Sequence, residues 1–90
     1  MREYVDVDGT RWHRRGGVME GKALERRMRR PEVIVRHHYL GTVVEVPVED
    51  RARFWSAAGE KMAASKYSGF YGVEFKDDAG RHLVLIDESC

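Results

Sequence analysis

The chain has 90 residues, of which 42% are hydrophobic and 34% are charged, and its formal net charge is +1. This length predicts one domain over residues 1–90, and the hydrophobic content is too high for a disordered chain. The only cysteine is Cys90, which excludes an internal disulfide and is a poor position for a thiol nucleophile. The sequence contains no signal peptide and no run of about 18 apolar residues, so we expect a cytoplasmic protein without membrane contact.

The N-terminal segment EYVDVDGTRWHRR predicts a β-hairpin. Val5 and Val7 alternate with charged residues, as they do in a half-buried strand, and Asp8-Gly9 is a strong signal for a two-residue turn. We expect Trp12 on the return strand to join Val5 and Val7 on the buried side, because side chains of a strand alternate between its two faces.

The following segment, residues 14–30, is rich in arginine and is interrupted by three glycines. Its second half predicts a short helix that ends before Pro31, with Leu24 and Met28 on one face. Two apolar residues make a thin stripe, and a helix this short is marginal without tertiary packing. The pattern therefore favours a segment that becomes ordered on a partner, with its methionines available for contact.

Residues 32–48 predict a second hairpin, or a pair of strands, around Leu40-Gly41-Thr42. Strand alternation divides its first strand between two faces. One face carries Val33, Val35, His37 and Tyr39, and the other carries Ile34, Arg36, His38 and Leu40. The adjacent histidines His37 and His38 should therefore point in opposite directions and should not share a metal ion.

The C-terminal half predicts one long helix and a third hairpin. Asp50 is the candidate helix N-cap, and four apolar residues repeat at three-and-four spacing: Phe54, Trp55, Ala58 and Met62. The hairpin turns at Asp77–Gly80, and its second strand is apolar enough to be central in a sheet. The expected fold class is α+β: a mostly antiparallel twisted sheet of five to six strands in the order ββ-α-ββ-α-ββ, with one main helix packed on a face.

The positive charge is concentrated in residues 11–38, which carry nine basic and three acidic side chains. Arginine is well suited to recognising carboxylates and phosphates, and a polarised charge distribution favours oriented association. The main hypothesis is therefore a small binding module without enzymatic activity that docks on another protein through residues 14–30. The candidate binding residues are Arg14, Arg15, Met19, Leu24, Arg26, Arg27, Met28, Arg29, Arg30, Arg36 and His38.

Two alternatives use the same residues differently. A nucleic-acid-binding protein would use Arg26, Arg27, Arg29 and Arg30 with neighbouring aromatic side chains such as Trp12 and Tyr39. A small metal-independent ribonuclease would use His37 or His38, His82 and Arg36 for acid–base catalysis and phosphate stabilisation. Residue types alone do not establish catalytic geometry, which is why binding without catalysis is preferred.

No metal-ligand spacing and no phosphate-binding glycine motif occurs in the sequence, so we expect neither a metal nor a cofactor. A protein partner is favoured over nucleic acid. A homodimer formed through an open sheet edge is a further hypothesis, because unpaired edge strands invite pairing.

Overall fold

The computed structural model describes residues 2–64 and 69–89, without the side chains of residues 62–64 and 89. The expectations for the Cys90 thiol and the Met62 side chain lie outside this range. The elements are β1 (Glu3–Val5), β2 (Arg11–Glu20), α1 (Gly21–Met28), β3 (Val33–Tyr39), β4 (Thr42–Glu45), a 3-10 turn η1 (Val48–Asp50), α2 (Arg51–Ala64), β5 (Gly69–Lys76) and β6 (His82–Ser89). The mixed α+β class with six strands and one main helix is as predicted.

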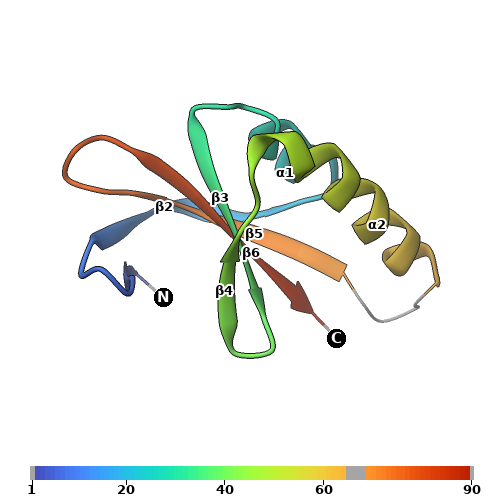
Figure 1. Cartoon of the computed structure of the whole chain (residues 1–90), viewed down its shortest axis with the longest axis horizontal. Coiled ribbons are helices and arrows are strands. Elements are labelled where there is room, and N and C mark those ends of the chain that lie inside the picture. Colours follow the sequence, from blue (N-terminus) through green and yellow to red (C-terminus); the bar gives the residue numbers. More distant parts are fainter. Residues whose placement is uncertain (1, 65–68, 90) are drawn as a thin grey trace.

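The six strands form one sheet in the order β1-β2-β5-β6-β3-β4 (Figure 1). The three expected hairpins are all present, and β2 pairs with β5 in the antiparallel sense as well. The prediction of antiparallel pairing is only partly matched, because β3 pairs with β6 in parallel. The apolar strand β6 lies inside the sheet, where its second edge accepts β3.

The first hairpin differs from its prediction in register and in turn length. Tyr4 lies opposite Trp12, so Tyr4 rather than its neighbour Val5 shares the face of the buried Trp12. Val5 is 55% exposed and Val7 is fully exposed, so the expectation that they are buried is wrong. The turn is longer than two residues because the Asp6 carboxylate accepts hydrogen bonds from backbone N–H groups further along the loop.

Both helices cover the same face of the sheet and form the larger core with it (Figure 1). Leu24 of α1 is fully buried against β5 and β6, where Gly72 leaves room for it. A Cβ atom at Gly72 would lie 2.5 Å from Cδ1 of Leu24 and 3.3 Å from Cγ1 of Val84. A glycine inside a strand here marks a close approach between the sheet and a helix.

The C-terminal end of α1 is fixed by Arg51, the first residue of α2. The Arg51 side chain is buried and donates hydrogen bonds of 2.7–3.3 Å to the backbone carbonyls of Met28, Arg30, Val33 and Val46. The last carbonyls of a helix have no partner within the helix, and Arg51 supplies one. We call these hydrogen bonds of Arg51 the clamp. The prediction that residues 14–30 lack enough contacts to become ordered alone did not include it.

The opposite face of the sheet carries a smaller core, and no helix formed by residues 2–64 or 69–89 covers it. Trp12, Phe75 and Leu83 are completely buried there, with Tyr4 among the partly buried side chains that pack against them. Beyond this cluster the face is only partly covered, and two hollows remain on it. We call this side of the sheet the open face, and the other side the helix-covered face.

Candidate functional site

A shallow hollow of about 350 Å³ lies beside α1 and is lined by Met19, Ala23, Arg26, Arg27 and Arg30. Arg26 and Arg27 lie on α1, and Arg30 follows two residues after the end of this helix at Met28. Met19 enters from the end of β2 and packs partly against the larger core. The hollow thus combines three guanidinium groups with a small apolar surface, and we call it the α1 hollow.

The three arginines of the α1 hollow differ in how strongly they are already paired. Arg27 forms a partly buried ion pair with Glu74, and its Nη2 lies 3.4 Å from Nδ1 of His82. Arg30 is paired with Glu32 at 2.8 Å, and both side chains are more than half exposed. Arg26 has neither an ion pair nor a hydrogen bond from its side chain among the described residues.

The neighbouring arginines on the same side of the sheet lie outside this hollow. Arg29 is held by Glu25 through an exposed ion pair of 2.8 Å along the helix. Arg15 is exposed on β2 directly opposite Glu74 of β5, which is also the partner of Arg27. Arg15 therefore adds positive charge next to the hollow without lining it.

Two candidate contact residues are inaccessible. Leu24 and Met28 are 0% and 1% exposed in the larger core, so the expectation that they contact a partner is wrong. Their spacing of four residues does place them on one face of α1, but that face packs on the sheet. Of the apolar side chains proposed for docking, Met19 alone lines the α1 hollow.

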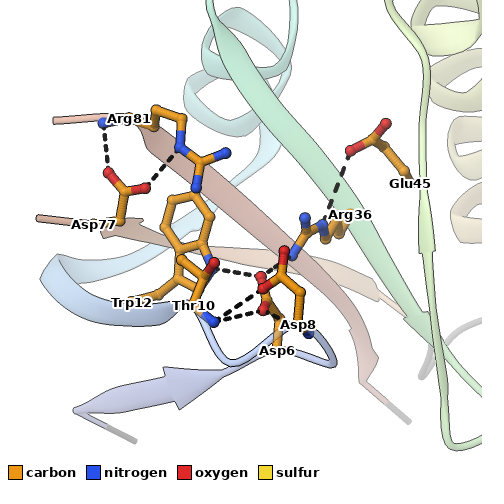
Figure 2. A network of polar contacts seen from close by, with 8 residues as sticks. All are labelled: Asp6, Asp8, Thr10, Trp12, Arg36, Glu45, Asp77 and Arg81. Carbon is orange, nitrogen blue, oxygen red and sulfur yellow. Dashed lines mark hydrogen bonds and ion pairs between the residues drawn. The ribbon is translucent and has the colours of Figure 1, made fainter. Parts of the chain in front are cut away.

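The open face receives the other three predicted residues: Arg14, Arg36 and His38. Arg14 lies opposite Phe75 in the ladder with β5, and its Nε donates to the carbonyl of Gly16 at 3.1 Å. Arg36 binds Asp6, with 3.1 Å between Nη1 and Oδ2, and it lies 4.0 Å from Glu45 (Figure 2). The structure therefore separates these residues from the α1 hollow instead of joining them to one basic surface.

Figure 2 shows that Arg36 belongs to a polar network around Trp12. The indole Nε1 donates to Asp6 at 2.9 Å, and the guanidinium carbons of Arg36 and Arg81 lie 5.8 and 5.2 Å from the indole ring centre. Asp77 in turn holds Arg81 at 2.7 Å. Cations at these distances are attracted to an indole ring. The network holds the two turns of the open face over the buried Trp12.

Asp6 is the centre of this network and stays ionised. Burial alone would raise its pKa, but hydrogen bonds with Asp8, Trp12 and Arg36 outweigh burial and hold the pKa of Asp6 well below its usual range. A carboxylate with several donors is stabilised in its charged form. Arg36 is thus engaged in holding the fold and is not available as a phosphate-stabilising cation.

The structure does not gather the histidines of the ribonuclease hypothesis. His37 lies on the helix-covered face, with its ring centre 5.0 Å from that of Phe54 and 5.9 Å from that of Phe70. His82 lies on the same face beside Arg27. His38 points to the open face, where its Nδ1 is 3.4 Å from Asp87. The predicted opposite orientation of His37 and His38 is confirmed, and it leaves His38 on the other face of the sheet from His82.

Burial lowers the pKa of His37, although the charges of Glu88 and Asp87 oppose this effect. Its Nε2 is buried and has no hydrogen-bond partner in the described part of the chain. In that part no three His, Cys, Asp or Glu side chains are grouped closely enough to hold a metal ion. No helix in the same residues combines the length and apolar character of a membrane span.

Comparison with protein-family models, with curated proteins and with solved structures finds no match to this chain.

Proposed function

We propose that this protein is a small binding module that docks an acidic segment of another protein in the α1 hollow. The observation that carries this proposal is the position of Arg26, which lines the hollow without an acidic partner among the described residues. Arg27 and Arg30 line the same hollow and bring two further guanidinium groups next to Arg26. Guanidinium groups form strong, oriented hydrogen bonds with carboxylates, which are the main acidic groups of a protein partner.

The existing ion pairs allow a partner carboxylate to replace a carboxylate of this chain in the α1 hollow. Arg30 and Glu32 are both exposed, and an exposed ion pair contributes only about 0–1 kcal/mol to stability. A partner carboxylate can therefore replace Glu32 at little energetic cost. Arg27 is different, because its pair with Glu74 is mostly buried and keeps its guanidinium in a fixed position. The hollow would thus offer one fixed and two adjustable cations beside an apolar surface from Met19 and Ala23.

The charge pattern around the hollow favours a peptide over a nucleic-acid backbone. Residues 19–32 carry five basic side chains but also three acidic ones: Glu20, Glu25 and Glu32. A nucleic acid presents regularly repeated phosphates, and its affinity depends on neutralising many of them. Interleaved carboxylates would repel part of such a backbone. A peptide with two or three acidic residues beside one apolar residue fits this mixture of basic and acidic side chains better.

The proposal is tested with fluorescent peptides that combine two or three Asp or Glu with one Leu, measured by anisotropy near physiological salt. Arg26→Glu should weaken binding by at least about tenfold, because it replaces an attraction at the hollow by a repulsion. Lys76→Glu is the matched control: it makes the same charge change on β5 at an exposed position outside the hollow, and it should change the affinity by less than about twofold.

The same titrations with single-stranded RNA and duplex DNA separate the alternatives. Binding of a nucleic acid, lost in Arg26→Glu and absent for the peptides, would replace the protein-docking proposal by the nucleic-acid hypothesis. Equal loss in Arg26→Glu and Lys76→Glu would mean that net charge alone drives binding, and the hollow would not be a site. The homodimer stays a prediction, with β1 and β4 as the two edges of the sheet.

A further inference from the structure

The strand β4 ends the sheet, and within the described part of the chain no strand pairs with its outer side. The backbone N–H of Val46 donates to the carbonyl of Val35 on β3 at 2.8 Å. Alternate residues of an antiparallel strand bond to the same neighbour, so the N–H and C=O groups of Val43 and Glu45 point away from β3. These groups are available to a further strand. We call this outer side of β4 the β4 edge.

A hollow lies on each face of the sheet beside the β4 edge. On the open face, a hollow of about 280 Å³ is lined by Val43 and Glu45 and by residues of the first turn such as Asp8. On the helix-covered face, a hollow of about 330 Å³ lies between Glu45, Pro47 and the first turns of α2. Glu45 lines both hollows. Because side chains of a strand alternate between its faces, a strand added at the β4 edge would direct neighbouring side chains into different hollows.

The hollow on the open face carries an excess of negative charge. Three carboxylates line it with one guanidinium, as Figure 2 shows: Asp6, Asp8, Glu45 and Arg36. Arg36 is closest to Asp6 at 3.1 Å, whereas Glu45 is 4.0 Å from Arg36 and 63% exposed. Asp8 is exposed, and its carboxylate accepts the backbone N–H of Thr10 but forms no ion pair among the described residues. This hollow therefore favours a lysine or arginine side chain.

The hollow on the helix-covered face favours an apolar side chain. Pro47 and Phe54 line it, and its charged residues Arg53 and Asp50 form an ion pair with each other. Val44 lies on this face of β4 and is 55% exposed. An apolar side chain placed beside Val44 and Phe54 would remove apolar surface from water on both sides of the contact.

We propose that the β4 edge binds an extended segment of another protein in which basic and apolar residues alternate. The segment adds one strand to the sheet, and its backbone bonds with Val43 and Glu45. Its basic side chains lie beside Asp8 and Glu45 on the open face, and its apolar side chains lie beside Phe54 on the helix-covered face. The β4 edge thus selects the charge opposite to that of the α1 hollow, and docking in that hollow is not required for it.

A second copy of the chain fits the β4 edge less well than a basic segment does. Symmetric antiparallel pairing of two β4 strands keeps Glu45 of both copies on the open face. The second carboxylate would lie near those of Asp8 and Glu45, and like charges side by side destabilise strand pairing. The four residues of β4, Thr42–Glu45, also contain no lysine or arginine to offset this repulsion.

The test uses short fluorescent peptides that alternate lysine and valine, measured by anisotropy near physiological salt. A peptide of the same composition with its lysines and valines in separate blocks is the control for charge attraction alone. We expect the alternating peptide to bind at least about tenfold more tightly. Only one set of its backbone N–H groups faces β4, so methylation of either the lysine or the valine nitrogens, but not of both sets alike, should abolish binding.

Two variants test the β4 edge from the side of the protein. Val43→Pro removes a donor that points away from β3, so the ladder with β3 keeps its bonds while the peptide loses one. Glu45→Lys reverses a charge of the hollow on the open face. Each should weaken binding of the alternating peptide by at least about tenfold. Glu60→Lys makes the same charge change at an exposed position of α2 outside both hollows and should change the affinity by less than about twofold.

Urea denaturation checks the folding of each variant, and the methylated peptides test the backbone bonds even if Val43→Pro does not fold. Equal binding of the alternating and block peptides, or equal loss in Glu45→Lys and Glu60→Lys, would show that net charge alone attracts the peptide and would reject the site. Sedimentation of the free protein tests the second copy as an occupant. A dimer that dissociates in Val43→Pro would assign the β4 edge to self-association and overturn the proposal.

Discussion

The two faces of the sheet achieve burial in different ways. On the helix-covered face, apolar side chains from α1 and α2 pack on the strands, and the buried Arg51 bonds with backbone carbonyls. On the open face, Trp12 is buried beneath turns that Asp6 and Arg81 hold in place through side-chain contacts. The helix-covered face holds α1 in place, and α1 exposes arginines on the side away from the sheet. The open face leaves hollows between polar groups, and so the two faces present different kinds of candidate site.

The largest expected effect comes from removing the clamp that holds α1 on the sheet. Arg51→Leu removes a donor from four carbonyls, of which that of Arg30 still accepts the backbone N–H of Val33. The other three hydrogen bonds are buried, and each unsatisfied buried polar group costs about 1–3 kcal/mol. We expect the free energy of unfolding, measured with urea at neutral pH, to fall by at least about 3 kcal/mol. The free energy of unfolding of Arg51→Lys should lie between those of the wild type and Arg51→Leu, because an ammonium group cannot reach the same set of acceptors.

Arg53 provides the control, because its side chain is 80% exposed on the same helix. Arg53→Leu should change the free energy of unfolding by no more than about 0.5 kcal/mol. If Arg51→Leu had an effect as small as Arg53→Leu, the order of residues 21–30 would not depend on the clamp.

A smaller effect is expected where the helix and the sheet approach most closely. Gly72→Ala introduces a Cβ atom 2.5 Å from Leu24, which is fully buried and has little room to move. Overpacking of this kind costs about 1–3 kcal/mol. In a Leu24→Ala background the added methyl group finds space, so Gly72→Ala should cost much less there, and a double-mutant cycle measures the difference.

Gly17→Ala is the matched control for this cycle, since a Cβ atom at Gly17 meets nothing within 4 Å. Its effect should stay within about 1 kcal/mol. Additive costs of Gly72→Ala and Leu24→Ala would contradict the contact between these two positions.

The smallest effect is a pH dependence confined to the helix-covered face. Burial lowers the pKa of His37 below its ordinary value of 6.5, so the folded protein binds this proton less readily than the unfolded chain. The stability that depends on neutral His37 should be complete above about pH 6.5 and should decrease as the pH falls below it. Urea denaturation from pH 7.5 to 5.5 should show a steeper loss in the wild type than in His37→Phe.

The other three histidines are present in both of these proteins, so the difference between the two slopes isolates His37. Identical slopes would mean that protonation of His37 is as easy in the folded protein as in the unfolded chain.

Local features of the fold are predictable from the sequence. The turn at Asp77–Gly80, the strand alternation that separates His37 from His38, and the helix stripe with Phe54 all follow from spacing over a few residues. Each depends on contacts between neighbours in the chain, and these are what periodicity reports.

The candidate sites were less predictable because they depend on long-range pairing. The contact of His38 with Asp87 requires the parallel ladder between β3 and β6, which no local pattern indicates. The end of the Arg-rich segment is held by hydrogen bonds from Arg51, which lies beyond the next hairpin. In the sequence Arg51 is an ordinary charged residue at the start of a helix. Residue type alone made Arg26 a candidate, and its separation from Arg14 and Arg36 followed only from the sheet topology.

The α1 hollow is tested most directly by NMR, with backbone amide shifts recorded on ¹⁵N-labelled protein during titration with an acidic peptide that contains one leucine. We predict saturable shifts concentrated in residues 19–30, with the amides of β1 and β4 unchanged, and loss of these shifts in Arg26→Glu. Saturable shifts centred on the β4 edge, or shifts that persist in Arg26→Glu, would contradict docking in the α1 hollow.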